Sequence, residues 1–442
     1  MDRSRSDSYT SGMRTVELLH HFSTHATPLG LPRGGEVSWD DAEFHRAAWA
    51  ADPEGYLLTA LVPGARPQQR ARALLQALAA SWAGVADGSR VTLEKATRAI
   101  LFDLPPATVL TVLLALRRLR ANHKHTTRAV LTFVLDHPQA PTLIDARRPT
   151  LVDCFEHALG KATARGCARR IAEGDTDSEY LRRNLLRFGA DPEQTRARVT
   201  ALYGPGVPGV PVPRTGVAPL DPEREREPVI TSTNRGDVAA TLVHLYRGGP
   251  EAELRPALGR YLAEVTRGLP PMPGSIALVA DTSESMRGYG DREWALLSQA
   301  VALRLVLAEV CPRLSVVEIG AGPEPTDLAG GLLDALATGP ELVVLVTDGY
   351  ENRLSGDLAR VVATLPRLGI DTPIVLCRSM FTGRDDLTLR NPAPALPCLD
   401  FWHQDDFAGL LPRLFAHCAD GRDWIHAAVR HRLDHRLEGV RP

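Results

Sequence analysis

The sequence predicts a multidomain protein with an all-α N-terminal part followed by an α/β part. Apolar residues recur at helical spacing from about residue 41 to residue 203, with almost no alternation of period two. Residues 204–228 then break the pattern with seven prolines and four glycines. After residue 274, short apolar runs alternate with helical patterns. This order predicts helices first and a mainly parallel sheet second.

The first part is expected to be a helical-repeat domain over residues 41–203, after a poorly structured or partly helical segment at 1–40. Residues 68–82 show the pattern, because their apolar side chains recur every three or four positions, as on one face of a helix. Helix pairs stacked into an array bury one stripe on each of many short helices. We therefore interpret this part as a HEAT-like array, although the residues themselves do not repeat. The other predicted helices are 92–103, 106–120, 126–136, 149–159, 161–173, 178–188 and 191–202.

The middle of the chain is expected to join the two parts. The prolines and glycines of 204–228 forbid a continuous helix, so this stretch is predicted to be an extended linker. Residues 229–267 are predicted to form a helical extension. The sequence GLPPMPG at 268–274 marks the next boundary.

The last part is predicted to be a domain over residues 275–420, followed by a helical tail at 421–442. Four short apolar runs are typical of buried parallel strands, and the stretches between them are predicted to be helices. In such folds ligands bind outside the carboxyl ends of the strands. The predicted strands are 275–281, 314–320, 341–348 and 372–377, and the helices are 291–311, 327–338, 355–366 and 406–417.

Composition restricts the partners and the compartment. The chain has 51 Lys and Arg against 53 Asp and Glu, so no global charge draws it onto nucleic acid or an anionic membrane. The six cysteines are far apart and are expected to be reduced and mostly buried. The N-terminus lacks the apolar stretch of a signal peptide, and the longest apolar run is too short to cross a bilayer. We expect a cytoplasmic protein with no membrane partner.

Oxygen-bearing side chains gather at three predicted strand-to-helix junctions. Asp281, Ser283 and Ser285 follow the first strand, Thr326 precedes a helix, and Asp348 ends a later strand. The carboxyl ends of parallel strands meet at one edge, so these five side chains are expected to surround one point. Ligation by oxygen alone suits a hard cation, Mg²⁺ or Mn²⁺.

This set resembles the metal-ion-dependent adhesion site of von Willebrand factor A domains, which have a Rossmann-like fold. The resemblance rests on D-x-S-x-S at 281–285, on Thr326 and on T-D-G at 347–349. It implies that the five residues are direct or water-bridged ligands, and that an acidic residue of a protein partner fills an open position on the metal. Glu284 stands where the family usually has a small residue. It could weaken an acidic partner or point into solvent, and we favour solvent exposure.

Two other interpretations of the five residues are weaker. Each could be an ordinary helix cap or turn residue, although all five in order are harder to explain in that way. The sequence lacks the G-x-S-x-G elbow, the phosphate-binding loop G-x-x-x-x-G-K-[ST] and a G-x-G-x-x-G loop after a strand. A metal-dependent hydrolase is disfavoured because no general base is evident. We therefore expect a binding protein and not an enzyme.

The helical part has a local excess of positive charge. Between Arg117 and Arg187 there are fourteen Lys and Arg against eight Asp and Glu. Arginines can bind phosphates and stack on exposed bases, but they could equally form solvated faces that pair with Asp153, Glu156 or Glu173. The histidines at 20, 21, 45 and 157 show no spacing typical of metal ligands. The predicted RNA-binding residues are Arg117, Arg118, Arg120, Lys124, Arg128, Arg165, Arg169 and Arg170.

The order of the two parts resembles the Ro autoantigen or TROVE architecture, whose helical ring binds small noncoding RNAs. It also resembles bacterial proteins found with a MoxR-type AAA+ ATPase. Two hypotheses follow. The first is a Ro-like RNA-binding scaffold without DNA specificity, whose cation site binds an acidic partner. The second is a metal-dependent protein-interaction adaptor, working with an AAA+ ATPase and without RNA.

Overall fold

The computed structural model describes residues 14–33, 35–204, 236–321, 325–351, 353–385, 387 and 390–438, with side chains described to residue 435. Helices come first and a parallel sheet follows, so the predicted order of an α part and an α/β part is confirmed. Nearly all of the predicted linker lies outside the described residues. The chain divides into two compact units, Met1–Pro222 with Leu433–Pro442, and Glu223–Arg432.

The first unit is built from helices that pack mainly on near neighbours in the sequence. The predicted helices are present, with shifted ends. Three earlier helices were not predicted individually, because their apolar faces are short. The helices are α1 (Thr15–Thr24), α2 (Ala42–Ala51), α3 (Pro53–Ala60), α4 (Pro67–Ala79), α5 (Asp87–Asp103), α6 (Pro106–Arg118), α7 (Lys124–Leu135), α8 (Ala140–Leu159), α9 (Lys161–Ala172), α10 (Glu179–Leu185) and α11 (Pro192–Tyr203).

Local chemistry explains where several of these helices begin or bend. The Asp52 side chain accepts a hydrogen bond from the N–H of Gly55, and Pro53 occupies the first turn of α3, both favourable at a helix start. Helix α8 is broken at Arg147, whose backbone leaves the helical region two residues before Pro149. The proline cannot donate to the preceding turn, so the helix bends there.

The second unit holds a five-stranded, all-parallel sheet in the order β2-β1-β3-β4-β5. Strands β1 and β3 are buried along their whole length, as expected of a sheet covered on both faces. Strand β5 was not predicted, because four residues at a sheet edge are too few to show a pattern. The strands are β1 (Ile276–Asp281), β2 (Leu314–Ile319), β3 (Leu342–Thr347), β4 (Ile374–Ser379) and β5 (Cys398–Phe401).

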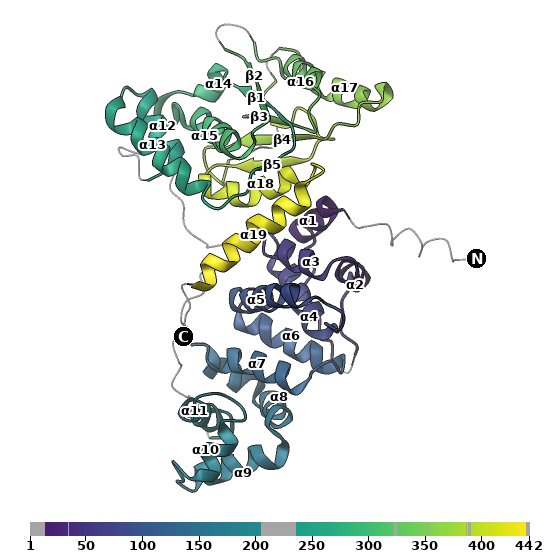
Figure 1. Ribbon diagram of the computed structural model, residues 1–442, viewed down its shortest axis with the longest axis vertical. Coiled ribbons are helices and arrows are strands. Elements are labelled where there is room, and N and C mark those ends of the chain that lie inside the picture. Colours follow the sequence, from purple (N-terminus) through teal and green to yellow (C-terminus); the bar gives the residue numbers. More distant parts are fainter. Residues whose placement is uncertain are drawn as a thin grey trace, which may run out of the picture. The chain divides into compact units, whose positions relative to one another are not determined.

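Helices cover both faces of this sheet (Figure 1). On one face, Leu328 and Leu332 of α16 (Leu328–Ala337) pack over alternate strand residues, among them Val279 and Leu345. On the other face, α15 (Ala295–Val310) packs against β1 and β4, and α12 (Val238–Tyr246) packs on α15. The predicted helical extension therefore covers the outer side of α15. The remaining helices are α13 (Glu251–Val265), α14 (Glu284–Arg287), α17 (Asp357–Thr364), α18 (Phe407–Phe415) and α19 (Gly421–Glu438).

The hydrophobicity of the helices shows whether any of them could span a membrane. Within the described parts of the chain, none of the helices combines the length and the apolar character needed to cross a bilayer.

Candidate functional site

The strand order creates one point where the loops that follow two neighbouring strands diverge, at the carboxyl ends of β1 and β3. The chain leaves β1 to form β2 on one side, and then crosses over to form β3 on the other side of β1. Ligands bind at such switch points, because the two loops part there and leave a crevice. Asp281 is the last residue of β1 and Asp348 directly follows β3, so both acids lie at this crevice. Both carboxyl side chains are buried.

Hydrogen bonds orient the residues that follow β1. One carboxylate oxygen of Asp281 accepts from the backbone N–H of Ser283 at 3.0 Å. The other accepts from the Thr347 hydroxyl at 2.7 Å, which ties the end of β1 to the end of β3. The hydroxyl oxygens of Ser283 and Ser285 are 3.0 Å apart. Four hydroxyl and carboxyl groups from two strand ends therefore share one small region.

Asp348 lies in the same region and interacts with Asp281. Its Oδ1 accepts a hydrogen bond from the N–H of Tyr350 at 3.1 Å, and the Ser285 side chain donates to the carboxylate. Burial raises the pKa of Asp348 above its ordinary value. Burial also raises the pKa of Asp281, and the nearby charge of Asp348 raises it further. Ionising both buried carboxyl groups without a bound cation costs free energy.

Thr326 is placed next to these loops by its backbone. It lies in the loop between β2 and α16, and its side chain is buried. Its carbonyl accepts a hydrogen bond at 3.3 Å from the N–H of Arg353, which lies in the loop after Asp348. The next residue, Asp327, caps α16 by accepting from Gly330 and forms an ion pair with Arg353. Thr326 is thereby fixed between the sheet edge and the start of α16.

Glu284 points away from the cluster. It is exposed, whereas Ser283 on one side is buried and Ser285 on the other is half-buried. The expectation of solvent exposure is confirmed. The residue begins α14, where an acidic side chain is favoured by the helix dipole.

The donor set fits a hard divalent cation. It consists of two carboxylates and two hydroxyls, with a third hydroxyl residue on the neighbouring loop, and none of these donors is nitrogen or sulfur. Mg²⁺ and Mn²⁺ prefer such ligands and keep some of their water. Burial raises the pKa of Asp348 more than the nearby charge of Arg390 lowers it. A bound cation would add positive charge beside the two carboxylates.

Several of the predicted RNA-binding residues have partners within the first unit. The Arg117 side chain pairs with Asp153, Arg165 with Glu156 and Arg169 with Glu173. These are the three partners that the alternative interpretation named. Arg170 pairs with Asp175 and also lies over the ring of Tyr180. Arg118 donates to the backbone carbonyls of Pro32 and Gly35, whereas Arg120 and Lys124 are exposed and Arg128 is half-buried.

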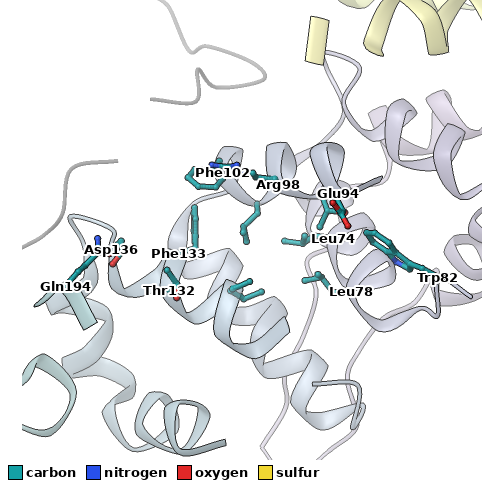
Figure 2. Close-up of a pocket in the computed structure, with 14 residues that line it drawn as sticks. Leu74, Leu78, Trp82, Glu94, Arg98, Phe102, Thr132, Phe133, Asp136 and Gln194 are labelled. Carbon is teal, nitrogen blue, oxygen red and sulfur yellow. The ribbon is translucent and has the colours of Figure 1, made fainter. Parts of the chain in front are cut away.

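A cavity of about 500 Å³ opens among α4, α5 and α7 in the first unit (Figure 2). Its wall is mainly apolar, with Trp82, Phe102 and Phe133 around it. Its charged side chains are two acids, Glu94 and Asp136, and one arginine, Arg98. An apolar wall with more acid than base does not suit a nucleic-acid backbone. The predicted RNA-binding residues do not line it.

The structure brings together a second group of metal-ligating side chains that sequence reasoning missed. His21 of α1 and His45 of α2 lie within reach of Asp41, and His25 lies beside Asp40 and Asp41. The expectation that His21 and His45 have no metal-ligand spacing overlooked a signal. The pairs 21/25 and 41/45 are each four residues apart, and residues at that spacing share one face of a helix.

Comparison with known proteins adds no family assignment. No model of a known protein family matches this chain, and a search of curated proteins finds no significant relative.

Proposed function

We propose that this protein is a metal-dependent protein-interaction adaptor. A divalent cation, Mg²⁺ or Mn²⁺, is held at the sheet edge by Asp281, Ser283, Ser285 and Asp348, with Thr326 as a direct or water-bridged ligand. The observation that carries the proposal is the pair of buried carboxylates at the switch point, which interact with each other and lie among serine and threonine hydroxyls. Two buried negative charges of this kind require a cation or a proton.

The partner is proposed to be an acidic protein segment. Two carboxylates leave a bound divalent cation formally neutral, so a carboxylate of the partner can occupy an open position on the metal. Exposed apolar side chains on the two loops offer further contact: Tyr289 follows α14 and is 90% exposed, and Tyr350 and Leu354 follow Asp348. Aromatic residues of this kind are enriched in protein interfaces. An AAA+ ATPase is one candidate partner class.

We propose binding and no chemical reaction at this site. The two loops that flank it, 282–294 and 348–356, contain no histidine or lysine. The carboxylates would be occupied by the metal, so neither would act as a general base. The site is therefore suited to holding an anion on a cation.

The RNA-binding hypothesis receives less support from the contacts. Four of its eight residues already pair with acids of the described chain. An arginine paired with a carboxylate gives up that pairing when it binds a phosphate, which reduces the gain. The Ro-like interpretation rests on the same residues.

The cation site is tested by Mn²⁺ titration of the full chain in a calorimeter. Asp348→Asn is the test variant, because the amide oxygen can still accept from the Tyr350 N–H. Asp334→Asn, on the exposed face of α16, is the matched control. We expect one Mn²⁺ per chain in the wild type and the control, and at least a tenfold loss of affinity in the Asp348 variant. Equal binding by all three proteins overturns the proposal.

The partner is tested by affinity capture from the native host. We expect one or more proteins to be retained in Mg²⁺ and released by EDTA, and to be absent from the Asp348→Asn capture. RNase treatment is expected to change nothing. A complex that resists EDTA and is lost with RNase favours the RNA-binding hypothesis instead.

A further inference from the structure

The first unit contains a compact His/Asp cluster where α1, α2 and α4 meet. The Nε2 atom of His21 lies 2.7 Å from Oδ2 of Asp41, and the Nε2 atom of His45 lies 3.3 Å from the same oxygen. The Nε2 atom of His25 is 3.2 Å from Oδ2 of Asp40 and 3.5 Å from Oδ2 of Asp41. Three imidazole nitrogens from two helices therefore converge on one carboxylate.

We propose that this cluster is a structural Zn²⁺ site, with His21, His45 and Asp41 as ligands and His25 as the fourth. The ligand atoms of His21, Asp41 and His45 lie within 4.8 Å of one another. Zinc in a tetrahedral site lies about 2.0–2.2 Å from nitrogen and oxygen ligands, so its ligand atoms are about 3.3 Å apart. The ligand atoms reach that spacing after shifts of up to about 1.5 Å. When the metal binds, the proton of each neutral imidazole lies on Nδ1, which leaves Nε2 free as the ligand.

One carboxylate oxygen is free to take the metal. The Asp41 side chain is more than nine-tenths buried, and its Oδ2 atom accepts from His21, His45, Gln69 and Arg72. Its other oxygen, Oδ1, is buried and has no hydrogen-bond partner among the described residues. An unpaired buried carboxylate oxygen is costly. A cation at Oδ1 removes that cost while Arg72 keeps its bond to Oδ2.

The second nitrogen of His45 has an oxygen partner of the kind that zinc ligands require. Its Nδ1 atom lies 2.6 Å from the hydroxyl oxygen of Tyr56, and both side chains are fully buried. Metal-binding histidines nearly always donate their other N–H to an oxygen, which fixes the ring and frees Nε2 for the metal. Tyr56 is therefore a positioning residue for the proposed site.

The charges around the cluster also favour a cation. Asp40 and Asp41 contribute two negative charges, and the fully buried Arg72, which binds both carboxylates at 2.6 Å, contributes one positive charge. With neutral histidines the group keeps one uncompensated negative charge. A zinc ion would compensate this negative charge. It would also join α1 to α2, two helices that a loop separates in the sequence.

The experiment loads untagged full-length protein with Zn²⁺ or Co²⁺ after removal of bound metal. All proteins carry Asp348→Asn, so that the oxygen-lined site of the second unit does not contribute. We expect one Zn²⁺ per chain by mass spectrometry, a rise in Tm on loading, and the visible absorption of tetrahedral Co²⁺ with nitrogen ligands. His21→Gln and His25→Gln are the test variants, and His20→Gln, exposed on the same helix, is the control.

The result expected is a loss of zinc affinity of at least tenfold in His21→Gln and His25→Gln, with no loss in His20→Gln. Tyr56→Phe removes no ligand and is expected to weaken binding about 10- to 100-fold. Circular dichroism of the metal-free variants checks that each is folded. The proposal is overturned if the folded protein that carries Asp348→Asn alone binds no zinc, or if the test variants bind as tightly as the control. The cluster would then be a hydrogen-bonded network only.

Discussion

Gly320 and Ser283 are packed so closely that a side chain at residue 320 has no room. A Cβ atom at Gly320 would lie 2.9 Å from the Cβ of Ser283 and 3.2 Å from its backbone N and Cα atoms. Gly320 also has a φ of +71°, which side-chain-bearing residues rarely adopt. The loop after β2 therefore presses directly on the D-x-S-x-S turn. The position of the Ser283 hydroxyl depends on a glycine from another loop.

Gly320→Ala is expected to damage both stability and cation binding. The left-handed backbone costs about 1 kcal/mol and the clash about 1–3 kcal/mol more, because the new methyl group meets the Cβ atom and the backbone of Ser283, which no side-chain rotation can move away. The D-x-S-x-S turn has to shift to make room for the new methyl group. The Ser283 hydroxyl moves with it, so the Mn²⁺ affinity falls as well. Thermal unfolding and Mn²⁺ titration of the full chain measure the two effects.

Gly339→Ala is the matched control. Gly339 has a φ of +65°, in the same second unit, but a Cβ atom there would meet nothing within 4 Å. This variant is expected to lower the free energy of unfolding only by the cost of the left-handed backbone, about 1 kcal/mol, and to leave the Mn²⁺ affinity unchanged. If the two variants lose the same stability and bind Mn²⁺ equally well, the contact between residues 320 and 283 does not position the site.

The fold was predictable where the apolar pattern was long. The runs 275–281 and 341–348 became the central, fully buried strands β1 and β3, because both sheet faces are covered. Strand β5 was missed, since it is short and lies at the edge of the sheet, where Cys398 and Leu399 are half-buried and Asp400 is exposed. Helix α2 was also missed, because its burial comes from aromatic rings and His45 and not from an apolar stripe.

The two candidate sites differed in how far the sequence could predict them. The D-x-S-x-S turn is local, so the approach of Ser283, Ser285 and Asp281 follows from three neighbouring residues and one strand end. The His/Asp cluster depends on α1 and α2 both packing on α4, with Arg72 of α4 bridging both acids. Such packing is set by tertiary contacts, which no local pattern encodes.

The basic residues of the first unit allow a direct test of RNA binding. Because the arginines of α9 pair with acids, we expect the full chain to bind a structured RNA only non-specifically, with a Kd of about 10⁻⁴–10⁻⁶ M at physiological salt. The variant Arg118→Glu/Arg120→Glu/Lys124→Glu tests the residues at the end of α6 and the start of α7. We expect it to weaken RNA binding by no more than a few-fold.

Filter binding over a range of salt concentrations measures the RNA affinity of the wild type and of the triple variant. The matched control is Arg165→Glu/Arg169→Glu, which reverses charges whose partners are known. Nanomolar binding that the triple variant abolishes, together with a shallower salt dependence, would contradict the adaptor proposal and support a nucleic-acid partner.

The cysteines provide a test of the packing of the second unit. The expectation that they are mostly buried is confirmed: five of the six are buried and Cys398 is partly exposed. Burial raises the pKa of Cys398 to about 11, and the charge of Asp400 acts in the same direction. Burial raises the pKa of Cys311 and of Cys418 to about 12. Since the thiolate is the reactive form, all three are expected to react slowly near neutral pH.

Titration with a thiol-specific disulfide reagent measures these rates. At pH 8 a thiol with a pKa of about 11 is roughly one-thousandth thiolate, so Cys398 is expected to react first but slowly, with a rate that rises about tenfold per pH unit. The thiols of Cys311 and Cys418 are expected to react only when the protein unfolds. In guanidinium, which unfolds the protein, all six thiols are expected to react together. Cys398→Ser is expected to remove the first phase, whereas Cys154→Ser, at a buried position, leaves it unchanged. Rapid reaction of several thiols in the folded protein would show that the helices over the sheet open far more readily than their packing implies.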